Sequence, residues 1–248
     1  MLLLVGKQSP NILIKGYFLK VNIIKGSPKF MLKLFDLSGK NDLRFSPPCW
    51  NVKLCLIQND IKFKTIPVRF TDKDKIAFSK QKLVPILDYK DGFVCDSWNI
   101  INWLNENYPE KKIFINNSSK NFSYFLYLWT SRQLLPILFK IIAHEIPNVL
   151  EGDDIDYYLK TREERINGPI TKFLPFISSY IEEFRKLIDP IRKIIIKNNY
   201  ISGKNPGIED CIFFGNLKWV DVCSPCNLLD NEDPVYQWYK NLLKLINK

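Results

Sequence analysis

The most informative part of this sequence is the stretch Lys82-Leu-Val-Pro-Ile-Leu87, followed by Cys95-Asp-Ser-Trp98. Pro85 interrupts an apolar run, and because a proline cannot donate to a β-ladder it belongs at a sheet edge, a bend or a cis peptide bond. Asp91-Gly92 predicts a hairpin turn. Asp96-Ser97 predicts the cap and first turn of a helix, since the residues that follow have helical periodicity. A strand end, a proline and a helix start thus lie close together, in an arrangement suited to a small acidic peptide.

The segments before this stretch alternate between strand and helix patterns. Residues 32–36 and 61–69 alternate as strands, the second ending at Pro67. Between them, Pro47-Pro48 predicts a helix start, because the first helical turn has no use for the missing N–H groups. The β-α-β order requires parallel pairing and the later hairpin requires antiparallel pairing. We therefore predict an α/β domain with a small mixed sheet of four strands over residues 31–112.

The second half of the chain has helical patterns only. Residues 113–120 are rich in Asn and Ser and are predicted as a linker, and residues 121–248 as an all-helical domain. Prolines 136, 175 and 190 fall inside helical patterns and predict kinks or breaks. The five predicted helices cover residues 122–145, 153–167, 173–197, 207–222 and 233–246.

Composition narrows the class of protein. The chain has 248 residues and a net charge of +10, of which residues 1–30 supply five lysines and no acid. The other lysines are scattered, so a nucleic-acid partner is not expected. No run approaches the roughly 18–20 apolar residues of a membrane helix, so no membrane span is expected. Six cysteines in a chain of this length are typical of reduced thiols, which favours a cytoplasmic location.

Residues 1–30 leave two interpretations open. A basic, acid-free start fits an organelle-targeting segment, but transit peptides favour Arg and Ser, and this segment has no Arg. The alternative is a basic N-terminal extension, with Met31 beginning the functional unit.

Ser46-Pro47-Pro48-Cys49 lies between a predicted strand and a predicted helix start. The free N–H groups and the dipole of a helix N-terminus favour an anion, and a thiolate there is stabilised. A hydroxyl at position 46 can donate a hydrogen bond to a thiolate but cannot exchange disulfides. The plain structural interpretation is an N-cap serine before a proline-initiated helix. Cys223-Ser-Pro-Cys226 also has redox or zinc spacing, but without a second pair nearby.

Three motifs occur together in one order: Ser-Pro-x-Cys-Trp at 46–50, Lys-x-Val-Pro at 82–85, and Asp-Ser-Trp at 96–98. Together they resemble the glutathione-binding half of the glutathione S-transferase superfamily. The resemblance is closest to the bacterial and fungal β-etherase-like branch and covers about residues 31–246. It includes residues 45–50, 67–73, 77–81, 94–98, 203–215 and 233–238.

The resemblance implies a thioredoxin-like domain followed by an all-helical domain, with glutathione as co-substrate and no metal. It implies that Asp96 and Ser97 bind the γ-glutamyl end, Val84-Pro85 the cysteinyl backbone and Lys82 the glycyl carboxylate, with Ser46 facing the thiol. A small hydrophobic co-substrate is implied, and members of the family are commonly homodimers. The family usually has Ser or Thr at the cap of the penultimate helix, where this chain has Gly207; Asp210 can bond back to the cap N–H.

Three functions follow from these expectations. The leading one is a glutathione transferase that activates the glutathione thiolate for attack on a hydrophobic or aromatic electrophile. A non-catalytic ligand-binding or carrier protein of the same fold is the main alternative. The third is a glutathione-dependent thiol-disulfide oxidoreductase, which would depend on Cys49.

Overall fold

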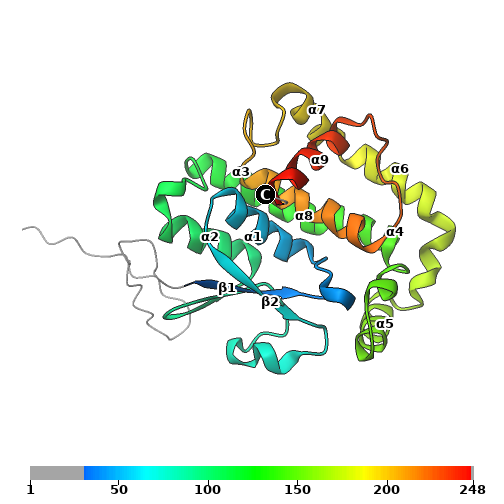
Figure 1. Cartoon of the computed structure of the whole chain (residues 1–248). Coiled ribbons are helices and arrows are strands. Elements are labelled where there is room, and N and C mark those ends of the chain that lie inside the picture. The colour runs from blue at the N-terminus through cyan, green and yellow to red at the C-terminus, as the bar shows by residue number, and fades with distance from the viewer. Residues whose placement is uncertain (1–30, 247–248) are drawn as a thin grey trace, which may run out of the picture.

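The structure is a computed structural model that describes residues 31–246. Its first part is a thioredoxin-like domain built on one mixed sheet (Figure 1). Strand β1 (Leu32–Leu37) pairs in parallel with β2 (Phe63–Val68) and antiparallel with β3 (Ile86–Tyr89). β3 pairs antiparallel with β4 (Gly92–Cys95), which gives the order β2-β1-β3-β4. The predicted mixed sheet is confirmed.

Two details of the predicted strands differ. β2 begins at Phe63 and ends at Val68, so Pro67 lies inside the strand and not at its end. A proline is tolerated there because β2 is an edge strand. In the hairpin, Gly92 pairs with Tyr89, so the two connecting residues are Lys90 and Asp91.

Helices cover both faces of the sheet. α1 (Pro47–Gln58) and α2 (Ser97–Asn107) lie on one face, and the short 3-10 helix η2 (Lys73–Ser79) lies on the other (Figure 1). α1 has a continuous buried run from Cys49 to Leu56. A helix is buried on all sides only when it is enclosed; here the sheet lies on one side of α1 and the helical domain on the other.

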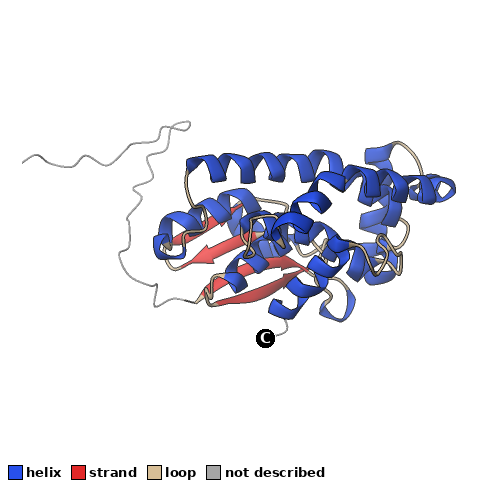
Figure 2. Ribbon diagram, turned by 90° about the horizontal axis from the view of Figure 1, so that it is seen from above, coloured by secondary structure: helices blue, strands red, loops and turns tan. Residues whose placement is uncertain are grey.

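The second part is all-helical, as predicted, but its described residues form seven α-helices where we predicted five. They are α3 (Asn117–Trp129), α4 (Leu135–Ile142), α5 (Asp153–Ile166), α6 (Ile177–Leu187), α7 (Asp189–Asn198), α8 (Ile208–Cys223) and α9 (Pro234–Ile246). Figure 2 shows this bundle beside the sheet.

The extra helices arise where prolines interrupt longer patterns. A π-helical turn, Thr130–Leu134, separates α3 from α4 just before Pro136. Pro175 lies in a 3-10 segment before α6, and Pro190 is the second residue of α7. α3 also begins earlier than expected, at Asn117, inside the predicted linker 113–120. Asn116 caps it, with its side chain accepting from the Ser119 N–H.

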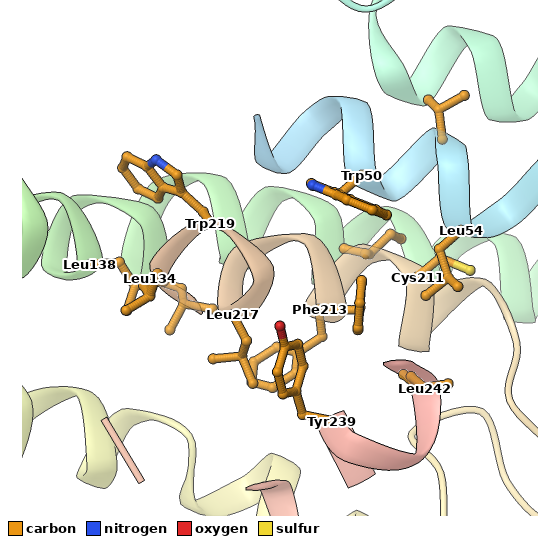
Figure 3. Close-up of a cluster of buried hydrophobic side chains, with 14 of the residues drawn as sticks. Trp50, Leu54, Leu134, Leu138, Cys211, Phe213, Leu217, Trp219, Tyr239 and Leu242 are labelled. Atoms are coloured by element: carbon orange, nitrogen blue, oxygen red, sulfur yellow. The ribbon is translucent and has the colours of Figure 1, made fainter. Parts of the chain in front are cut away.

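The two domains share one apolar core along α1 and α8. Trp50 of α1 packs edge-on against Phe214 of α8, with ring centroids 6.0 Å apart. Figure 3 shows part of this core, where Trp50 and Leu54 of α1 face α8. Gly215 permits the close approach, because a Cβ there would overlap the Pro47 carbonyl and the Asn51 side chain. The position of α1 relative to the helical domain is therefore fixed by packing.

A polar contact joins the domains at a second place. The fully buried Asp154 of α5 accepts hydrogen bonds from Arg69 Nε at 3.1 Å and from the N–H and hydroxyl of Thr71 at 2.9 and 2.7 Å. Within residues 31–246, the helices are too short or too polar for any to cross a membrane.

Candidate functional site

The sheet register brings the predicted site segments to one edge. Ile86 pairs with Phe35 of β1 and with Cys95 of β4. The residues just before Ile86 and just after Cys95 therefore lie at the same end of the sheet as the carboxyl end of β1. From that end the chain leads into the starts of α1 and α2. The register thus places Val84-Pro85, Asp96-Ser97 and the loop leading to Ser46 at one sheet edge.

The peptide bond between Val84 and Pro85 is cis, as one of the predicted options required. Val84 is half-buried and Pro85 is buried at the start of β3. Lys82 lies two residues earlier with an exposed side chain, and its carbonyl accepts a hydrogen bond from Lys73 Nζ at 3.0 Å. The ammonium group of Lys82 is therefore at the surface beside the sheet edge.

Ser46 is the N-cap residue of α1, but its hydroxyl makes no capping hydrogen bond. An N-cap side chain normally accepts from the N–H of the second or third helical residue. Here the first two helical residues are Pro47 and Pro48, which leaves only the third as a possible donor. Ser46 is 7% exposed. Its hydroxyl is therefore held at the positive end of α1 without being used to cap it.

Cys49 lies in the first turn of α1 and is completely buried. Burial raises its pKa well above the ordinary value, and the charge of Asp36 adds to this, while hydrogen bonds from Ser46 and from the Leu37 backbone oppose it. Asp36 is itself buried and ion-paired with Lys53 at 2.7 Å. The Cys49 thiol is therefore neutral at physiological pH and closed to solvent.

Asp96 caps α2, as predicted. One carboxylate oxygen, Oδ1, accepts from the N–H groups of Trp98 and Asn99 at 3.0 and 3.1 Å. Its backbone has φ 75°, a conformation that non-glycine residues adopt at a cost and that clusters at functional sites. The side chain is exposed, so the second carboxylate oxygen can meet a ligand.

Ser97 is the first residue of α2 and is 1% exposed. Its hydroxyl has no hydrogen-bond partner among the described residues. Buried polar groups are nearly always paired, so an unpaired hydroxyl at a helix N-terminus fits a site that an anion completes. The residues present therefore fit the carboxylate of an amino-acid head group.

Tyr127 of α3 also reaches this site, and the sequence did not predict it. Its hydroxyl donates to Asp96 Oδ2 at 3.2 Å. Its ring packs against Trp98, with centroids 5.6 Å apart, and Trp98 also contacts Tyr124 at 4.9 Å. The three-residue spacing of the two tyrosines places them on one face of α3. That spacing was visible in the sequence, but their partner on α2 was not.

The second cysteine motif lies in the helical domain, away from the sheet edge. Cys223 and Cys226 are both free thiols, Cys223 at the end of α8 and Cys226 in the loop that follows. No group of three or more His, Cys, Asp or Glu side chains within residues 31–246 is placed to hold a metal ion.

Comparison with known proteins covers both domains. Residues 42–112 match the family model "Glutathione S-transferase, N-terminal domain", and residues 122–240 match "Glutathione S-transferase, C-terminal domain". A glutathione S-transferase of Ceriporiopsis subvermispora solved in complex with glutathione has a TM-score of 0.77 and 19% identity, over 88% of this chain and 97% of that one.

Two further solved structures are similar. Glutathione transferase GSTFuA3 from Phanerochaete chrysosporium has a TM-score of 0.76 and 14% identity, over 87% of this chain and 97% of its own. A second C. subvermispora enzyme in complex with glutathione has a TM-score of 0.70 and 14% identity, over 88% and 99%. At these identities the likeness is one of fold.

Proposed function

We propose that this chain, which belongs to the glutathione S-transferase superfamily, binds glutathione and activates its thiolate for attack on a hydrophobic or aromatic electrophile. The observation that carries the proposal is the start of α2. There, a strained and exposed Asp96 stands next to a buried Ser97 hydroxyl that makes no well-formed hydrogen bond within residues 31–246. A cation and a carboxylate on one ligand carbon would satisfy both, and the γ-glutamyl end of glutathione has that pair.

The rest of the tripeptide follows the sheet edge. Asp96 would accept from the ligand ammonium, while Ser97 and the first N–H groups of α2 would donate to the α-carboxylate. The cysteinyl backbone would pair with the main chain of Val84, as an extended peptide pairs with a strand edge. The exposed Lys82 would meet the glycyl carboxylate. These assignments use every residue that the sequence pattern singled out for this ligand.

Ser46 would act on the thiol. Its hydroxyl, which does not cap the helix, can donate a hydrogen bond to a thiolate, and the N-terminus of α1 adds a favourable partial charge. Lowering the pKa of a thiol by two units from its reference value of about 8.5 requires about 2.7 kcal/mol. One hydrogen bond to a charged group contributes about 1.5–3 kcal/mol, so this pair of effects is sufficient in size. The thiolate sulfur then bonds to the electrophilic carbon of the co-substrate, which expels a leaving group or takes up a proton.

The state of Cys49 argues for Ser46 as the active group. A thiol that exchanges disulfides must be exposed and must ionise readily. Cys49 is completely buried with a raised pKa, which disfavours the oxidoreductase alternative. We therefore keep the transferase as the proposed activity.

The finer features of the proposal rest on the sequence motifs. We place the chain near the β-etherase-like branch, so ether-linked aromatic compounds belong in the substrate panel. Conjugating hydrophobic electrophiles would give it a role in detoxification, in a cytoplasmic setting where thiols stay reduced. A homodimer, common among related proteins, is part of the same proposal.

Titration with glutathione tests the proposal directly. The Trp98 ring packs against Tyr127, whose hydroxyl is hydrogen-bonded to Asp96. Tryptophan fluorescence should therefore change as glutathione is added and should level off when the site is saturated. The absence of a change in fluorescence and in calorimetry at millimolar glutathione would refute the proposal. Glutathione binding without conjugation, reduction or ether cleavage across a panel of electrophiles would instead support the carrier function.

A further inference from the structure

The Tyr127–Asp96 contact connects the two domains at the proposed ligand site. Asp96 begins the last helix of the thioredoxin-like domain, and Tyr127 belongs to the first helix of the helical domain. Asp96 Oδ1 is occupied by capping the helix, whereas Oδ2 accepts only the Tyr127 hydroxyl among residues 31–246. The oxygen available to a ligand is thus the one that Tyr127 already contacts.

The Tyr127 hydroxyl is a proton donor in this arrangement. Burial raises its pKa, Ser97 nearby lowers it, and the charge of Asp96 raises it further. It is therefore protonated at physiological pH and donates its one proton to Asp96 Oδ2. A phenol oxygen also accepts hydrogen bonds, so a cation at Asp96 Oδ2 would find a second acceptor in Tyr127. The Ser97 hydroxyl, by contrast, makes no well-formed hydrogen bond with the Tyr127 hydroxyl.

Aromatic packing holds Tyr127 in position. Its ring lies 31° from the plane of Trp98 and 14° from the plane of Tyr124, with centroids 5.6 and 6.3 Å away. Trp98 packs in turn against Phe114, with centroids 5.6 Å apart. A tyrosine has few rotatable bonds, and a ring that is already packed between neighbouring rings loses little entropy when a ligand binds. The hydroxyl is thus preorganised beside Asp96.

We propose that Tyr127 is a specificity-determining residue that, together with Asp96, recognises the free α-ammonium group of a γ-glutamyl peptide. This inference rests on the proposed function and names the part of the ligand that the helical domain selects. Asp96 supplies the charge, and Tyr127 supplies a second acceptor and orients the carboxylate. Peptides that lack the α-amino group are therefore poor ligands.

A protein–ligand double-mutant cycle tests the proposal. The variants are Y127F, which keeps the ring stack, and Y124F, which changes a tyrosine on the same stack whose hydroxyl has no hydrogen-bond partner within residues 31–246. The ligands are glutathione and its desamino analogue, in which a glutaryl group replaces the γ-glutamyl group. Dissociation constants are measured by calorimetry on the full chain.

We expect Y127F to weaken glutathione binding about tenfold, as the loss of one hydrogen bond to a charged group predicts, and to leave binding of the desamino analogue unchanged. Y124F should leave both constants unchanged. Unchanged glutathione binding in Y127F overturns the inference, as does an equal loss for both ligands, which would indicate a structural role. Failure of the wild-type chain to bind glutathione refutes the proposed function itself, and the inference with it.

Discussion

The starts of α1 and α2 lie at the same end of the sheet, yet their cap residues are used in opposite ways. One carboxylate oxygen of Asp96 accepts hydrogen bonds from two backbone N–H groups of α2. Ser46 occupies the same position in α1, and its hydroxyl caps nothing. The difference lies in the residues that follow, because Pro48 lacks one of the two N–H groups that an N-cap side chain accepts from, which leaves only that of Cys49.

This contrast suggests a division of labour between the two helices. A side chain that caps its helix is held rigidly and suits recognition, whereas a hydroxyl at a helix N-terminus that makes no capping bond can be used in chemistry. We therefore assign ligand binding to the start of α2 and thiol activation to the start of α1. Variants of Asp96 should accordingly weaken glutathione binding, whereas variants of Ser46 should lower turnover.

The largest expected effect is on glutathione binding at α2. Asp96→Ala removes the charge that would meet the ligand ammonium, and we expect the dissociation constant to rise about a hundredfold, as for the loss of a hydrogen bond to a charged group. The variant should also lose about 1–2 kcal/mol of folding stability, because the cap is lost. Calorimetry and chemical denaturation measure the two effects separately.

Asp96→Asn is the matched control. An asparagine keeps the capping oxygen and tolerates the positive φ, so stability should stay within about 0.5 kcal/mol of wild type. Its binding should still be weakened, by about tenfold, because the charge is gone. Equal binding by wild type, D96A and D96N would contradict the role given to Asp96.

The next effect is on turnover at α1. Ser46→Ala should lower the rate at neutral pH by about ten- to a hundredfold, since the bound thiol loses a hydrogen bond worth about 1.5–3 kcal/mol. Folding stability should change by less than about 0.5 kcal/mol, although serine-to-alanine changes at N-caps typically cost about 1 kcal/mol. Steady-state kinetics at saturating glutathione, with denaturation alongside, checks both values. A variant with full turnover, or one that loses as much stability as a lost cap, would remove the distinction between the two helices.

The smallest expected effect is at Cys49. Because its thiol is buried and neutral, Cys49→Ser should keep turnover within about twofold of wild type. Replacing a side chain that takes part in the reaction would instead lower turnover by at least tens of fold. In the folded chain, an alkylating reagent should modify the partly exposed Cys95 and Cys226 before Cys49, as mass spectrometry of peptides can show. Rapid native labelling of Cys49, or abolished activity in C49S, would restore the oxidoreductase alternative.

Local patterns in the sequence predicted much of this site. The Asp96 cap and the proline-led start of α1 depend on neighbours within a few residues, so their chemistry was visible directly. Pro85 alone left three options open; the resemblance to the family favoured the cis bond at Val84-Pro85, and the structure confirms it.

Features that depend on packing were not predictable in the same way. Tyr127 meets Asp96 across 31 positions of sequence, and the contact exists only because α3 packs beside α2. The absence of a capping bond from Ser46 was not predictable either, since the sequence alone equally predicts an ordinary N-cap. The number of helices was harder to predict, because a proline within a periodic segment can bend a helix or end it: near Pro136 the helical backbone continues through a π-turn, whereas Pro190 lies at the start of a separate helix.

The most direct test is a pH titration of bound glutathione, followed by the ultraviolet absorbance of its thiolate. At saturating ligand, we expect a thiol pKa about two units below the free value of about 8.5 in the wild-type chain and in Cys49→Ser, and a return most of the way to the free value in Ser46→Ala. A bound thiol that titrates at the free value in the wild-type chain, or at the same lowered value in Ser46→Ala, would contradict the role given to Ser46.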